Sequence, residues 1–172
     1  MAANSGPFGE NPLIVDTVVR AGEIGMSYFG NTENKVWYKN GKSPVSMADK
    51  EIDAFLKTTL TAALPDHGWL SEETDDDDAR LDCERVLIVD PIDGTRGFLE
   101  GRKEWCISLA VIENNRPVEA VLHCPPLERT FYAKLGQGVK CSALVEPKKR
   151  TPGKPLATGS KKLIETMAQL PG

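Results

Sequence analysis

The chain has 172 residues, of which 40% are hydrophobic and 27% are charged, the balance of an ordinary globular domain rather than of a disordered chain. No stretch approaches the roughly 18 apolar residues of a membrane-spanning helix, and the first residues lack a basic segment followed by an apolar one, so a cytoplasmic protein is expected. The formal net charge of −4 gives no long-range attraction to nucleic acid or to an anionic membrane, so an anionic substrate must be held by local groups or by metal.

Two amphipathic helices are predicted in the first part of the chain. Asn11-Pro12 is typical of a helix start, and apolar residues then recur at helical spacing for about 18 residues. The second helix is predicted to begin at Ser46, which forms the pattern of a capping box with Asp49 three positions later, and to end before Pro65.

Short runs of β-branched and apolar residues, separated by turn residues, predict strands. These strands are expected over residues 36–38, 68–71, 85–90, 105–112, 117–123 and 129–133. The last three are expected to form an antiparallel meander, because an asparagine-rich turn joins the first two of them. We therefore predict an α+β fold in which two helices cover one face of a mostly antiparallel sheet.

Two features that could suggest other metal sites have simpler explanations. Residues 75–78 are four consecutive aspartates with no glycine turn and no spaced ligands, which favours a solvated loop over a calcium site. The four cysteines form no C-x-x-C pair and have only two histidines to accompany them, so buried or idle thiols are favoured over a disulfide or a zinc site.

The segment VLIVDPIDGTRGF, residues 86–98, leads an apolar strand directly into Asp90 and Asp93. Pro91 fixes its own φ and Gly94 permits a sharp turn, so both carboxylates can face one pocket, with backbone N–H groups of the turn aimed at an anion. Closely packed carboxylates need protons or cations, and oxygen ligands favour magnesium over zinc. The segment therefore predicts a site for two-metal phosphoryl transfer, and the alternative is a polar turn that closes a strand.

Three other motifs accompany D-P-I-D-G-T. They are S-P-V-S-x-A-D at residues 43–49, S-E-E at residues 71–73, and E-W-C-I-S-L-A-V-I-E at residues 104–113 with N-R-P-V after it. Together these motifs resemble the inositol monophosphatase superfamily of magnesium-dependent, lithium-sensitive phosphomonoesterases, over roughly residues 12–140. The S-P-V-S and S-E-E forms look more like those of 3'(2'),5'-bisphosphate nucleotidases than like those of inositol phosphatases.

The resemblance implies a set of metal ligands. These are Glu72, Asp90, Asp93 and the backbone carbonyl of Ile92. The implied cofactor is Mg²⁺, as two or three ions. One metal would lower the pKa of a water, and a second would stabilise the leaving oxygen.

The resemblance also implies the catalytic and substrate-binding residues. Glu72 and Thr95 would position the attacking water, and Asp49 would lie at an outer metal position or help to hold the water. Gly94 and Thr95 would contact the substrate phosphate. For Asp49 the residues alone leave another explanation open, namely a carboxylate that complements the dipole at a helix start.

The implied complete fold is a layered αβαβα sandwich, of which this chain supplies the first helix pair and the mostly antiparallel sheet. The implied activity is hydrolysis of a small phosphorylated metabolite. The first substrate expected is the 3'(2')-phosphate of a nucleoside bisphosphate, and the alternative is inositol 1-phosphate or a related sugar or polyol phosphate. A homodimer is expected, and neither a nucleic acid polymer nor a membrane is expected as a partner.

One element of the superfamily pattern is missing. Superfamily members usually carry a further metal-binding aspartate in a W-D element of their second half, whereas Trp37, Trp69 and Trp105 precede Tyr, Leu and Cys here. We therefore expect the chain to be part of a longer polypeptide whose metal site is incomplete as written. The alternative from another class is a non-catalytic binding or regulatory protein, and an unrelated α+β domain is a third interpretation.

Two parts of the chain are predicted on this basis. Residues 1–145 are expected to form a metal- and phosphate-binding α+β domain. Residues 146–172 are expected to be a basic linker rich in proline and glycine, followed by the start of a further α/β domain that the chain lacks. Residues 148–162 carry six positive charges and no negative one, and a solvated linker is favoured there over a nucleic-acid-binding or phosphate-binding tail.

Overall fold

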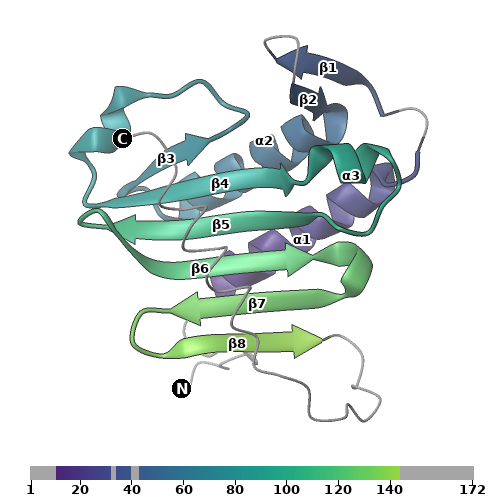
Figure 1. Ribbon diagram of the computed structural model, residues 1–172. Helices are drawn as coiled ribbons and strands as arrows, with labels where there is room; N and C mark the ends of the chain where they lie inside the picture. Colours follow the sequence, from purple (N-terminus) through teal and green to yellow (C-terminus); the bar gives the residue numbers. More distant parts are fainter. Residues whose placement is uncertain (1–10, 32–33, 40–42, 144–172) are drawn as a thin grey trace.

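The computed structural model describes residues 11–31, 34–39 and 43–143 (Figure 1). The helices are α1 (Pro12–Tyr28), α2 (Met47–Ala63) and α3 (Thr95–Leu99), with 3-10 turns at Asp78–Asp82 and Pro125–Leu127. The strands are β1 (Val36–Lys39), β2 (Ser43–Ser46), β3 (His67–Ser71), β4 (Arg85–Asp93), β5 (Cys106–Glu113), β6 (Arg116–Cys124), β7 (Arg129–Lys134) and β8 (Gly138–Ala143). The predicted basic linker and final helix lie outside the described residues.

Six strands form one sheet in the order β3-β4-β5-β6-β7-β8. The β3–β4 pair is parallel and every later pair is antiparallel, so the predicted meander is confirmed. Residues 72–84 make the crossover that parallel pairing requires. The four aspartates 75–78 lie in this crossover and are exposed, as predicted.

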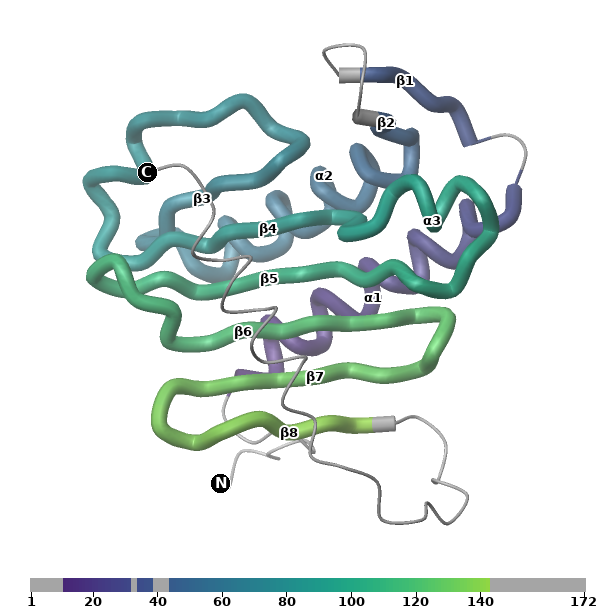
Figure 2. Tube along the Cα trace, in the orientation of Figure 1, coloured from purple at the N-terminus to yellow at the C-terminus, as the bar shows by residue number. Residues whose placement is uncertain are grey.

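The long helices α1 and α2 lie side by side on one face of the sheet (Figures 1 and 2). The α2 helix packs against β3 and β4, whereas α1 packs against β5 and β6. Fully buried side chains from both layers form the core, among them Ile14, Val18, Ile52, Leu56, Leu87, Leu109 and Tyr132. The predicted α+β class, with helices on one face of a mostly antiparallel sheet, is confirmed.

Two of the strands were not predicted from the sequence. β8 was not predicted, because Val139 is its one β-branched residue and it lies at the edge of the sheet, where Val139 and Lys140 face solvent. β2 was not predicted either, because proline is uncommon within a strand and β2 contains Pro44. β2 instead pairs antiparallel with β1 in a separate two-stranded sheet. None of the described helices combines the length and the apolar character needed to cross a bilayer.

The α1 helix approaches the sheet through a glycine. A Cβ atom added to Gly25 would lie 2.7 Å from Cη2 of Trp105, the residue before β5. Trp105 also packs edge-on against Phe98 of α3, with ring centroids 4.9 Å apart. Gly25 therefore lets α1 reach the aromatic contact that holds α3 in place.

Gly25→Val is expected to lower the free energy of unfolding by about 1–3 kcal/mol, because the added methyl groups overpack the contact with Trp105. Helix propensity alone favours valine over glycine, so a decrease in the free energy of unfolding can be attributed to packing. Urea denaturation measures the difference. Met26→Val, at the neighbouring exposed position, is the matched control, and equal stability of the two variants would contradict the close contact.

Candidate metal and phosphate site

The carboxyl ends of β3 and β4 lie at the same edge of the sheet because the two strands are parallel. Ser71, the last residue of β3, is paired with Val89, and the N–H of Glu72 donates to the carbonyl of Val89 at 3.4 Å. Glu72 therefore follows β3 at the level where β4 reaches Asp90. Two motifs that are separate in the sequence, S-E-E and D-P-I-D-G-T, meet here.

The turn after Asp90 has an irregular backbone. The register of β4 against β5 shifts between Asp90 and Asp93, and Gly94 then adopts a φ of 98° as the residue before α3. A Cβ atom on residue 94 would lie 2.8 Å from the carbonyl oxygen of Glu104, so both the conformation and the space require glycine. The predicted sharp turn is confirmed, whereas contact of Gly94 with a phosphate stays a prediction.

Asp49 lies at the start of α2 and is only 2% exposed. Its Oδ2 accepts hydrogen bonds from the backbone N–H of Ser46 at 2.7 Å and from the Ser46 hydroxyl at 2.6 Å, within the predicted capping box. Its Oδ1 lies 3.3 Å from Oγ1 of Thr95. Asp49 thus caps the helix and also contacts the turn after β4, so the two explanations of this residue are compatible.

Thr95 connects two of the predicted site residues. Its Oγ1 lies 3.0 Å from the carbonyl oxygen of Ile92 as well as 3.3 Å from Asp49. The hydroxyl has a single hydrogen, which it can donate to either oxygen, and its own lone pairs stay available to accept a hydrogen bond. The structure therefore brings together Asp49, Thr95 and the carbonyl of Ile92.

Electrostatics identify Asp90 as the centre of the acidic cluster. Burial, followed by the negative charges of Glu72, Asp93 and Asp49 in that order, raises its pKa from 3.8 to about 8. The pKa of Asp49 is also raised by burial, against the opposing effect of its hydrogen bonds to Ser46. Four carboxylates therefore share one neighbourhood, where full ionisation requires a compensating cation.

The donor chemistry of this cluster fits a hard divalent cation, because its ligands would be carboxylate and carbonyl oxygens. The side chains do not enclose such an ion by themselves. Among the described residues, no group of three or more His, Cys, Asp or Glu side chains is arranged so that it could hold a metal. Glu72 is exposed at the rim, while Asp90 and Asp93 are half-buried.

A pair of thiols borders the site and was not predicted to do so. Sγ of Cys106 lies 3.8 Å from Oδ2 of Asp93. Its hydrogen bond to Cys124 raises the pKa of the Cys106 thiol and lowers that of Cys124. All four cysteines of the chain are free. The position of Cys106 within E-W-C-I, the motif that follows D-P-I-D-G-T along the chain, was the available signal.

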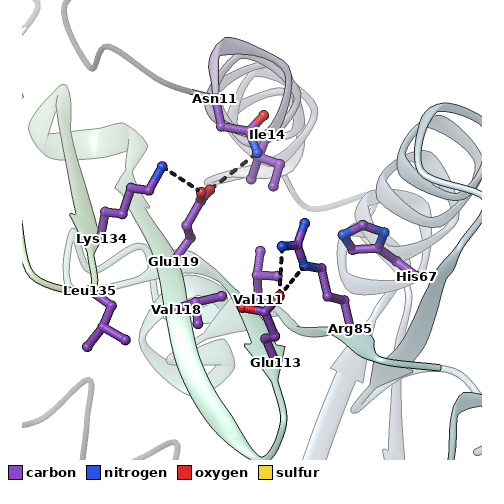
Figure 3. A pocket seen from close by; sticks show the side chains of 10 residues that line it. All are labelled: Asn11, Ile14, His67, Arg85, Val111, Glu113, Val118, Glu119, Lys134 and Leu135. Atoms are coloured by element: carbon purple, nitrogen blue, oxygen red, sulfur yellow. Dashed lines mark hydrogen bonds and ion pairs between the residues drawn. The ribbon is translucent and has the colours of Figure 1, made fainter.

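A pocket of about 270 Å³ lies at the other end of the sheet (Figure 3). Figure 3 shows that its charged side chains contact one another: Arg85 pairs with Glu113 at 2.7 Å, and Lys134 with Glu119 at 3.5 Å. Arg85 begins β4, whereas Asp90 and Asp93 lie at its other end. The pocket is therefore separate from the acidic cluster, and its ion pairs join neighbouring strands.

Comparisons with known proteins agree with the motif arrangement. The model of the inositol monophosphatase family matches residues 12–169. A histidinol-phosphatase of Chlorobaculum parvum is 29% identical to the chain over 141 residues, covering 78% of this chain and 54% of that protein. The 3'(2'),5'-bisphosphate nucleotidase CysQ of Haemophilus influenzae is 30% identical over 128 residues, covering 73% of this chain and 48% of that protein.

A solved structure has the same fold over most of the described chain. The extragenic suppressor protein suhB from Bartonella henselae superimposes with a TM-score of 0.71 at 28% identity, covering 75% of this chain and 50% of that one. The chain therefore spans about half the length of the relatives that it matches.

Metal-free protein is expected to lose stability as the pH rises from about 4 to about 8. The folded Asp90 carboxyl keeps its proton up to a pKa of about 8, whereas the unfolded carboxyl loses it near the ordinary value of 3.8. One pKa unit corresponds to about 1.4 kcal/mol, so the loss is at most about 6 kcal/mol. Urea titrations in EDTA across this pH range measure it.

Asp90→Asn is expected to remove most of this pH dependence, because the amide does not ionise. Asp16→Asn, on the exposed side of α1, is the matched control and should leave the dependence unchanged. An equally steep dependence in Asp90→Asn would show that another group is responsible.

Proposed function

Because the chain belongs to the inositol monophosphatase family, we propose that its acidic sheet edge is part of the active site of a metal-dependent phosphomonoesterase. The observation that carries this proposal is the gathering of four carboxylates where β3, β4 and α2 meet, three of which raise the pKa of the fourth, Asp90. Such a cluster is costly without a cation and suits the binding of one.

The proposed metal is Mg²⁺, as two or three ions. The proposed ligands are Glu72, Asp90, Asp93 and the carbonyl of Ile92. A bound divalent ion would supply the positive charge that lowers the pKa of a water and stabilises the leaving oxygen. The chain as given provides no W-D element, and the described carboxylates alone do not enclose an ion.

Thr95 and Asp49 are proposed to orient the attacking water, together with Glu72. The Thr95 hydroxyl donates toward Asp49 or the carbonyl of Ile92, which leaves its lone pairs free to accept a hydrogen bond from that water. The pKa of Asp49 is raised by burial, which favours its acceptance of a proton relayed through Thr95. Gly94 and Thr95 are proposed to contact the phosphate at the start of α3.

The proposed substrate is the 3'(2')-phosphate of a nucleoside bisphosphate, on the basis of the S-P-V-S and S-E-E forms at residues 43–46 and 71–73. The similarity to the nucleotidase CysQ supports this choice, although a histidinol-phosphatase, a protein with another named activity, is similar to the chain to nearly the same degree. Inositol 1-phosphate or a related polyol phosphate is the alternative. A homodimer, a cytoplasmic location and sensitivity to lithium stay predictions.

A second function is favoured by a specific observation. The carboxylates of the described residues do not by themselves enclose a metal. A non-catalytic protein that binds metal or phosphate at this edge is therefore the competing proposal.

Purified full-length protein is expected to release phosphate from 3'-phosphoadenosine 5'-phosphate only with Mg²⁺, and Asp93→Asn is expected to reduce the rate by about 100-fold or more. The loss follows from removing a charged metal ligand. Phosphate release with and without EDTA measures both effects, with inositol 1-phosphate and histidinol phosphate assayed in parallel to rank substrates.

Asp82→Asn, in the exposed crossover, is the matched control and should keep wild-type turnover. Undiminished turnover by Asp93→Asn would overturn the site assignment. Calorimetric binding of Mg²⁺ without turnover of any of the three substrates would instead favour the non-catalytic protein.

A further inference from the structure

Asp53 is a second buried carboxylate on α2, one helical turn after Asp49. It is 6% exposed, and both of its oxygens are hydrogen-bonded to hydroxyl groups of one short segment. Ser71 donates to Oδ1 and Thr74 donates to Oδ2. Sequence analysis did not single out Asp53, although a second aspartate four positions after Asp49 marks the same helix face.

The segment that Asp53 holds is the one that carries Glu72. Ser71 ends β3 and is 7% exposed, and its hydroxyl oxygen also accepts the N–H of Glu73 at 3.2 Å. Thr74 follows two residues after Glu72. A single carboxylate therefore holds, by hydrogen bonds, the residues before and after Glu72 and Glu73, where the crossover leaves the sheet.

The cost of this arrangement argues for a purpose beyond packing. Asp53 lies on the apolar face of α2 beside Ile52 and Leu56, and burial of a carboxylate there is unfavourable unless its hydrogen bonds are satisfied. An apolar residue would fill this position on the core side of the helix without that cost. What the carboxylate adds is a fixed geometry for residues 71–74.

We propose that Asp53 is a positioning residue that holds Glu72 toward Asp90 through its hydrogen bonds to Ser71 and Thr74. This inference rests on the proposed metal site. The rigid helix α2 then sets both halves of that site, because Asp49 contacts the turn after β4 and Asp53 holds the segment after β3. Partners of this kind, behind the metal ligands, typically change metal affinity by 10-fold to 100-fold when removed.

The test is the dissociation constant of Mg²⁺, measured by titration calorimetry on the 172-residue chain. Asp53→Ala is expected to weaken binding by about 10-fold to 100-fold. Asp53→Asn is expected to stay within about 3-fold of wild type, because the amide can accept from Ser71 and donate to Thr74. Equal loss in both variants would show that the charge of Asp53 acts directly, which would overturn the positioning role.

A double-mutant comparison shows whether Asp53 acts through Glu72. Once Glu72→Gln has weakened binding, adding Asp53→Ala should change the dissociation constant by less than about 2-fold. If the double variant instead shows the product of the two separate losses of Mg²⁺ affinity, the proposal is overturned. The same holds for an Asp53→Ala variant that is less stable but binds Mg²⁺ as wild type does, because that result would indicate a structural role alone.

If Asp53→Ala does not fold, removal of single hydroxyl groups provides the test. Thr74→Val and Ser71→Ala should each weaken Mg²⁺ binding several-fold, whereas Thr58→Val, on the exposed side of α2, should not. No effect of either deletion would overturn the proposal. If the wild-type chain binds no Mg²⁺, the proposed metal site is wrong, and this inference is wrong with it. If the wild type and the variants of Asp53, Ser71 and Thr74 all bind Mg²⁺ equally, only this inference is wrong.

Discussion

The parallel pairing of β3 with β4 is the constraint on which the acidic site depends. Parallel strands end at the same edge, so Ser71 pairs with Val89 and the acids after each strand are brought together. The burial of Asp90, together with its proximity to the other carboxylates, produces the raised pKa and the requirement for a proton or a cation. The site is thus a consequence of one strand pairing.

The α2 helix completes the acidic site whose first part is formed by the pairing of β3 with β4. Its packing against β3 and β4 brings the helix start to the same sheet edge, where Asp49 contacts Thr95. The helix lies against the core through Ile52 and Leu56, which are fully buried. Aromatic packing of Phe98 against Trp105 anchors α3 from the other side. The polar contacts of the site are therefore supported by apolar packing on two elements.

Local patterns in the sequence were sufficient for the features whose partners lie close in the chain. The capping box of Ser46 and Asp49 and the glycine turn at Gly94 were both predicted, since each depends on residues within a few positions. Asp53 was missed, because its partners lie 18 and 21 positions away. The β8 strand was missed for a related reason: its weak pattern becomes a strand only by pairing with β7.

The sequence by itself determined the helices, the central strands, the family resemblance and the identity of the acidic motifs. These depend on periodicity, turn chemistry and short motifs, all of which are local. Only the tertiary structure decided that S-E-E lies beside D-P-I-D-G-T, that burial and the neighbouring charges raise the pKa of Asp90, and that Asp53 is hydrogen-bonded to the segment carrying Glu72. Those properties depend on burial and on distances between residues far apart in the chain, which no local pattern specifies.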